Sequence, residues 1–77
     1  MRDKDTEKLA AKIVAELMKA RKEQDVSHEK LAEATGLSRA SISFIENNKR
    51  NPTLVTCLKI AKALDVDFAA IIRRSGK

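Results

Sequence analysis

Apolar residues recur along this chain at intervals of three and four, the spacing that gathers side chains on one side of an α-helix. The longest such run covers about residues 5–23. Its stripe consists of Leu9, Ala10, Ile13, Val14, Leu17, Met18 and Arg21. The chain holds only two glycines and one proline, few for a β-rich protein with many tight turns. The pattern therefore predicts an all-α structure.

Four shorter helices follow in the pattern, each preceded by a residue type that caps helix N-termini. Their expected ranges are about 28–35, 39–47, 54–64 and 67–73, and the caps are Ser27, Ser38, Thr53 and Asp67. Gly36 ends the first of them, as glycine often does. Asn48 is a candidate for a left-handed conformation, which asparagine tolerates. The buried stripe of the 54–64 helix is predicted to be Leu54, Cys57, Leu58, Ala61 and Leu64.

The length of 77 residues predicts one compact five-helix domain, residues 1–77. A domain of this size buries only about 60% of its unfolded surface, so packing on a second subunit would add stability. Lys and Arg outnumber Asp and Glu by 16 to 11, and the isoelectric point is about 9.7. A basic domain attracts phosphate polymers, although a charge of this size also serves solubility alone.

Candidate chemistry other than nucleic-acid binding is sparse. Cys57 is the only cysteine, which excludes an internal disulfide, fits a reducing cytoplasm and predicts a buried structural thiol. His28 is the only histidine; it has no plausible nucleophile beside it, and a metal site would need more ligands. The carboxylates form no paired acid–base arrangement. We therefore expect no enzyme activity, no cofactor and no metal, and no apolar run approaches the ~18 residues that span a membrane.

Residues 28–47 carry the most informative pattern: two short helices joined by a short turn that contains glycine, the helix-turn-helix signature. Ala32 is small where the two helices would cross, and Gly36 lets the chain reverse. The inward positions are Leu31, Leu37, Ile42 and Ile45, and the outward polar positions are Arg39, Ser41 and Ser43. An ordinary helical hairpin within a bundle is the alternative reading, because a glycine turn alone is common.

A helix held in this way can lie in the major groove of DNA, with its first residues at the base edges. Arg39 can bind guanine O6 and N7 through two hydrogen bonds, and Ala40 can touch a thymine methyl group. Ser43 can donate or accept at a base edge. Phe44 either packs on thymine methyl groups or belongs to the core. We predict Arg39, Ala40, Ser43 and Phe44 as base-reading residues.

Together these residues resemble the Cro/cI-type (Xre-like) family of helix-turn-helix regulators of bacteria and phages, over about residues 17–72. The matching positions are Ser27, Leu31-Ala32, Gly36-Leu37-Ser38, Ile42, Ile45-Glu46-Asn47, Lys49-Arg50-Asn51-Pro52-Thr53 and the run 58–64. The resemblance implies a phage-repressor-like fold whose second and third helices form the DNA-binding unit. Asp25 and Asn48 depart from it, since both occupy positions where glycine is common.

The resemblance also implies roles for individual residues. His28, where the family often has glutamine, is expected at a phosphate near a helix N-terminus, or simply as exposed surface. The predicted phosphate contacts are His28, Ser38, Asn48, Lys49 and Arg50. Arg21 and Glu46 match a pair that forms a salt bridge bracing the third helix in several relatives. Ala32 and Gly36 complete the predicted structural support.

The last helix carries Phe68, Ile71 and Ile72, which either close the core or form a seam between two subunits. One recognition helix reads few base pairs. We therefore expect two copies of the chain to pair through this seam, as a homodimer that reads two half-sites of double-stranded DNA. The prediction is a transcriptional regulator, a repressor, without a small-molecule effector. A phage repressor, a restriction–modification controller and a toxin-linked antitoxin fit equally. The rival reading is a protein-interaction module in which the third helix and Phe44 bind another protein.

Overall fold

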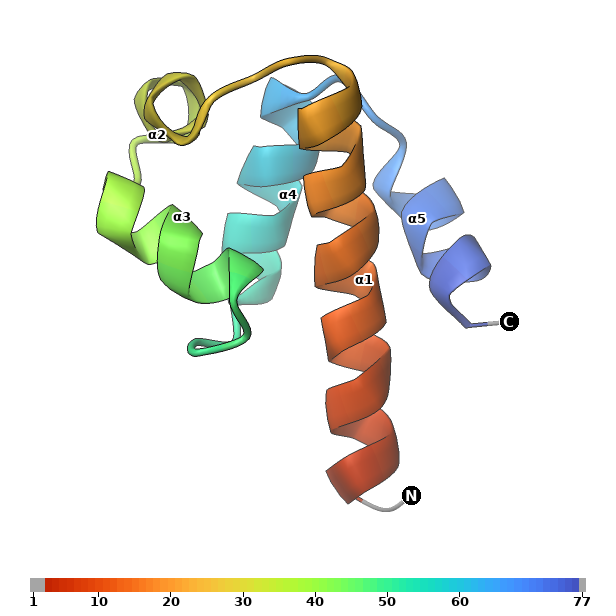
Figure 1. Ribbon diagram of the computed structural model, residues 1–77. Helices are drawn as coiled ribbons and strands as arrows, with labels where there is room; N and C mark the ends of the chain where they lie inside the picture. The colour runs from red at the N-terminus through yellow and green to blue at the C-terminus, as the bar shows by residue number, and fades with distance from the viewer. Residues whose placement is uncertain (1–2, 77) are drawn as a thin grey trace.

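Five α-helices make up most of residues 3–76, the part of the chain that this computed structural model describes. They are α1 (Asp3–Glu23), α2 (His28–Thr35), α3 (Arg39–Glu46), α4 (Leu54–Ala63) and α5 (Phe68–Ser75). The predicted all-α, five-helix fold is confirmed, and the helix ends differ from the expected ones by two residues at most. α1 runs the length of the molecule, with α5 on one side and α3 and α4 on the other, and α2 packs on α3 and α4 (Figure 1).

The four short helices begin at the capping residues that the sequence predicts. The hydroxyls of Ser27, Ser38 and Thr53 each accept a hydrogen bond from the backbone N–H three residues later, at 3.0–3.1 Å. The carboxylate of Asp67 accepts one from Ala69 N–H at 3.0 Å. These bonds satisfy N–H groups that have no partner within the helix. The start of each helix is therefore set by a local contact.

α1, α3 and α4 end on non-glycine residues with positive φ: Asp25 at 56°, Asn48 at 58° and Asp65 at 55°. At each end, backbone N–H groups bond to carbonyl oxygens three and five residues earlier, which is the Schellman arrangement. Asp and Asn accept this conformation better than most residues do. The left-handed Asn48 was predicted from the sequence, whereas the equivalent role of Asp65 was not.

The hydrophobic core draws on all five helices. Its largest fully buried side chains are Leu17, Leu31, Ile42, Ile60, Leu64 and Ile71. The first turns of α1 project beyond the other helices in Figure 1, and residues 4–8 are exposed. The core-forming part of α1 is thus its second half, which holds α3, α4 and α5 together. Within residues 3–76, no helix is both long and apolar enough to cross a membrane.

The predicted buried stripe of α4 is partly wrong. Cys57, Ala61 and Leu64 are buried, but Leu54 is 66% exposed and Leu58 is 48% exposed. Ile60, absent from that stripe, is fully buried. α4 is apolar around most of its circumference, so more than one stripe fits the helical period, and contact with α1 and α2 decides which one is covered. Burial also raises the pKa of the Cys57 thiol, which supports a structural role for this residue.

Candidate nucleic-acid interface

The turn between α2 and α3 is held by local hydrogen bonds. The N–H of Gly36 donates to Ala32 O at 2.8 Å, and the buried hydroxyl of Thr35 donates to Leu31 O at 2.7 Å. Gly36 has a φ of 78°, and no atom lies within 4 Å of the place where a Cβ would stand. Glycine is therefore favoured here by its backbone conformation and not by lack of space. The turn sets the angle at which α3 leaves α2.

One side of α3 is buried in the core, and the opposite side is exposed to solvent. Ile42 and Ile45 are 0% and 3% exposed, so they fix the helix to the core. Arg39, Ala40 and Phe44 are exposed, while Ser43 is half-buried. The predicted base-reading residues thus lie on the outer part of one helix whose position is set by packing. A rigid helix with a polar outer side is what direct reading of base edges requires.

Arg21 and Glu46 lie as the family resemblance implies. Arg21 Nη2 is 2.9 Å from Glu46 Oε1, and its Nη1 donates to Val26 O at 2.7 Å. Burial favours the neutral form of Glu46, but hydrogen bonds from His28 and Arg21 outweigh it and lower the pKa of this carboxyl. The contact joins the end of α1 to the end of α3, and it is largely screened from water, since the two side chains are only 12% and 20% exposed.

His28 has an intramolecular partner that the sequence did not indicate. Its Nε2 lies 3.0 Å from Glu46 Oε1, while the phosphate contact expected for this residue stays a prediction. The imidazole is therefore a third member of the contact between Arg21 and Glu46, because the carboxylate is the nearest strong acceptor for a ring N–H. The group now links α1, α2 and α3.

The loop after α3 carries two cationic residues, Lys49 and Arg50, and the side chain of Arg50 lies back against the helix. Lys49 is exposed, and its N–H donates to Phe44 O at 2.8 Å. The guanidinium carbon of Arg50 lies 5.5 Å from the centre of the Phe44 ring, and Nη1 donates to Ser41 Oγ at 3.2 Å. Phe44 is 43% exposed, so it lies outside the core and carries an arginine on its face. Arg50 thus lies over α3 and does not extend freely from the loop.

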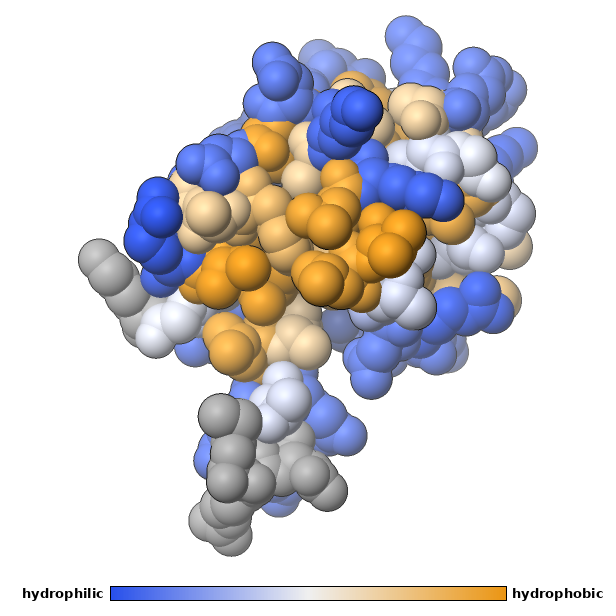
Figure 2. All heavy atoms as spheres, turned by 180° about the vertical axis from the view of Figure 1, so that it is seen from behind, coloured by the Kyte–Doolittle hydropathy of each residue, from blue (hydrophilic) through white to orange (hydrophobic). Residues whose placement is uncertain are grey.

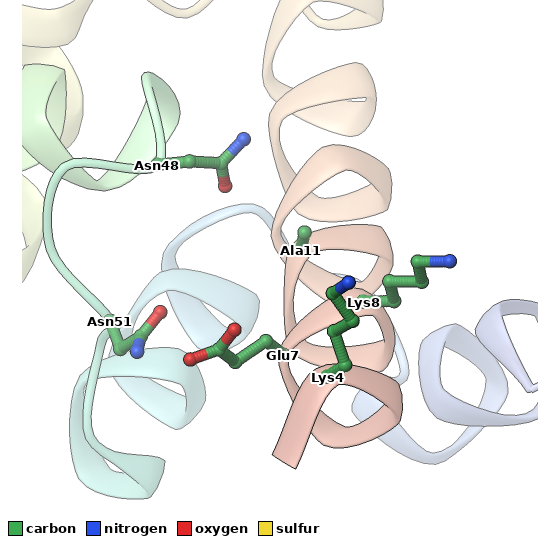
Figure 3. Close-up of a pocket in the computed structure, with 6 residues that line it drawn as sticks. All are labelled: Lys4, Glu7, Lys8, Ala11, Asn48 and Asn51. Carbon is green, nitrogen blue, oxygen red and sulfur yellow. The ribbon is translucent and has the colours of Figure 1, made fainter. Parts of the chain in front are cut away.

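A cleft of about 410 Å³ separates this loop from the first turns of α1. Asn48 and Asn51 point toward it from the loop side, and Lys4, Glu7 and Lys8 line it from α1 (Figure 3). The amide of the predicted phosphate contact Asn48 therefore faces α1. Glu7 turns its carboxylate toward Asn51 in the same view, so the cleft mixes charges and does not favour a phosphate group within it.

Two polar residues near the outer side of α3 were given no role from the sequence. Ser41 Oγ accepts hydrogen bonds from Ser38 Oγ at 2.9 Å and from Arg50 at 3.2 Å. The side chain of Asn47 donates to Ser43 O at 2.9 Å. Ser41 lies one helical turn before Phe44, a spacing that was readable from the sequence. Its bond to Arg50 depends on the path of the loop, and the sequence did not indicate that path.

The family comparison agrees with this geometry. A model of the helix-turn-helix family matches residues 17–71. The chain belongs to the Cro/cI-type helix-turn-helix family. It is 41% identical over 66 residues to the HTH-type transcriptional regulator SutR of Escherichia coli, and 40% identical over 52 residues to the control protein C.SmaI of Serratia marcescens. Both names describe regulators and not enzymes, as the sequence predicts for this chain.

Coverage differs among these family members. The matched regions are 86% and 68% of this chain, but only 37% of SutR and 62% of C.SmaI, so the chain spans less than two thirds of either protein. A mutant of the restriction–modification controller protein C.Esp1396I is similar in structure, with a TM-score of 0.81 and 33% identity over 90% of both chains. The resemblance in fold therefore extends over nearly the whole of both molecules.

A second exposed surface of the present chain, away from α3, is apolar. Of the three residues predicted for a dimer seam, Ile71 is 1% exposed and belongs to the core. Phe68 is half-buried and Ile72 is 42% exposed. Leu54, Val55 and Leu58 of α4 are also exposed. We call Leu54, Val55, Leu58, Phe68 and Ile72 the apolar face.

Apolar side chains gather at the centre of the side turned away from the viewer in Figure 1, as Figure 2 shows. A hollow of about 200 Å³ lies between α1, α4 and α5, lined in part by Ile13, Leu54, Phe68 and Ile72. The sequence did contain a signal for this surface. α4 carries more apolar positions than one buried stripe can hold, and the surplus was assigned to the core.

Proposed function

We propose that the chain is a sequence-specific transcriptional regulator that binds double-stranded DNA as a homodimer at a two-fold symmetric operator. The observation that carries this proposal is the outer side of α3. It presents Arg39, Ala40 and Phe44 to solvent, while Ile42 and Ile45 hold the helix in place. Repression is the proposed mode, because it requires only that the bound dimer occupy its site.

Two kinds of contact divide the work at this interface. Arg39, Ala40 and Ser43 are proposed to read bases. Ser38 and Lys49 are proposed to bind phosphates, helped by the N-termini of α2 and α3, where the helix dipole favours anions. The net charge of +5 supports attraction to DNA over longer distances.

The dimer is proposed to form through the apolar face. Monomeric proteins rarely leave several large aliphatic side chains together in water, and Leu54, Val55 and Leu58 are about half exposed or more. Pairing two copies through this surface leaves both α3 helices free, because the face lies on α4 and α5. The names of C.SmaI and C.Esp1396I support a controller role among the three biological settings.

One observation favours the rival reading, a protein-interaction module. Phe44 exposes part of an aromatic ring on α3, as a protein-binding helix would. Its ring, however, faces the cation of Arg50, and Arg39 and Lys49 lie nearby along the chain. A surface with this charge suits a polyanion better than a neutral peptide.

Selection from a randomised duplex library tests the proposal. Enrichment of a two-fold symmetric sequence, with half-sites about 34–36 Å apart, would support a dimeric regulator. Retention of DNA without enrichment would replace sequence-specific regulation by general DNA packaging. Failure to retain any duplex at low salt would overturn the proposal and favour a protein partner. Affinity should also fall steeply with salt, because each neutralised phosphate releases counterions.

A further inference from the structure

The position of Arg50 points to more than attraction to phosphate. Its guanidinium lies over the ring of Phe44 and donates to Ser41 Oγ. Ser41 and Phe44 are three residues apart on α3, so they are neighbours on one side of the helix. An arginine of the loop therefore covers part of the helix surface that faces outward beside Ala40.

The backbone around Arg50 is constrained as well. Asn48 adopts its left-handed conformation at a φ of 58°, and Lys49 N–H donates to Phe44 O. These contacts fix where the loop leaves α3. The ring contact and the hydrogen bond to Ser41 together hold the guanidinium over α3, and the contact with the ring face uses none of its five N–H donors. One donor goes to Ser41 and the others remain for a ligand.

We infer that Arg50 is a specificity-determining residue that reads a base edge, and that Phe44 is the positioning residue that holds it. This inference rests on the proposed function. A guanidinium fork held at two points, by the Phe44 ring and by Ser41, suits the paired acceptors O6 and N7 of guanine, whereas phosphate can be met from many directions. The ordering of the side chain before binding lowers the entropy lost at the DNA. Arg50 would thus add one base pair to those read from α3.

The test compares variants on the operator recovered by selection and on operators with one base pair changed at a time. Arg50→Lys keeps the charge but loses the planar fork. The affinity of this variant for DNA should depend on salt as that of the wild type does. At one base pair of the operator, the variant should lose the roughly 5- to 150-fold preference of the wild type for the original base pair over a changed one. Arg73→Lys is the matched control on α5, where the side chain is exposed, and should leave all preferences unchanged. Circular dichroism checks that each variant is folded.

Phe44→Leu tests the positioning role. It should weaken the preference at the same base pair as Arg50→Lys, and it should have little further effect when both changes are combined. An effect of Phe44→Leu that persists in full in the double variant would mean that Phe44 contacts DNA itself and would overturn its assignment. If Arg50→Lys keeps every preference of the wild type, or weakens all DNA equally, Arg50 is a phosphate contact.

The two proposals fail in different ways. If the wild type selects an operator but the Arg50 and Phe44 variants keep its preferences, only the base-reading role of Arg50 is lost. If the wild type enriches no sequence, sequence-specific regulation fails and the role of Arg50 fails with it. Wild-type selection therefore comes first, and its product supplies the DNA for the variants.

Discussion

α3 and α4 are similar in construction and opposite in surface chemistry. Each is a short helix with a capping hydroxyl at its start and a buried side in the core. The outer side of α3 carries Arg39 and a phenylalanine, Phe44, whose ring faces the guanidinium of Arg50. The outer side of α4 carries Leu54, Val55 and Leu58. Burial thus explains how both helices are held, whereas their exposed residues differ, because those of α3 include cations and those of α4 are aliphatic.

The largest expected effect comes from making the apolar face polar. Leu58→Glu should raise the dimer dissociation constant by about 30-fold or more, which corresponds to about 2 kcal/mol, because a carboxylate would have to be buried in the seam. Sedimentation equilibrium measures the change. The monomer should stay folded, since Leu58 is half exposed already.

Ala63→Glu is the matched control for this charge. Ala63 is exposed on α4, about 140° around the helix from Leu58 at 100° per residue, so dimerisation should be unaffected. Equal weakening by both variants would place the seam elsewhere. A wild-type protein that stays monomeric at high micromolar concentration would count against the dimer altogether.

The next largest effect, on the stability of the fold, comes from the contact between Arg21 and Glu46. Glu46→Gln should lower the free energy of unfolding at neutral pH by about 1.5–3 kcal/mol, because the charge of Arg21 then lacks its counter-charge in a largely covered position. Urea denaturation measures it. Glu33→Gln, an exposed carboxylate of α2, is the control, and equal losses for the two variants would contradict a special role for Glu46.

The pH dependence of this difference follows from the lowered pKa of Glu46. A carboxyl whose pKa is lower in the folded state stabilises the fold above its ordinary pKa, about 4.3 for glutamate. That stabilisation is lost as the pH falls through the lowered value. Wild type and Glu46→Gln should therefore converge in stability as the solution is acidified, and a difference that stays constant would exclude the charge as its cause.

The smallest effects come from shortening single side chains of the DNA-binding surface. Arg39→Ala should cost about 1–3 kcal/mol on the operator and relax the preference at one position. Lys49→Ala should weaken operator and random DNA alike and reduce the salt slope by about one unit. Titrations at several salt concentrations separate the two. Equal losses of Arg39→Ala on both DNAs would contradict base reading.

Local rules were enough to predict much of this molecule. The helix starts at Ser27, Ser38 and Thr53, the turn at Gly36 and the left-handed Asn48 depend on bonds between residues close in sequence. The buried anchors Ile42 and Ile45 also follow from the helical period, whereas the period left open whether Phe44 is buried or exposed.

Three features required the tertiary structure. The exposed side of α4 could not be assigned, since its apolar residues allow several stripes and only packing on α1 and α2 selects Ile60 over Leu58. The contact of His28 with Glu46 joins residues 18 apart, and the return of Arg50 to Ser41 spans nine. The sequence by itself determined where helices begin, turn and anchor, because these are local matters of backbone bonding and period. Which surplus side chains stay exposed, and which distant charges meet, was decided only by how the helices pack.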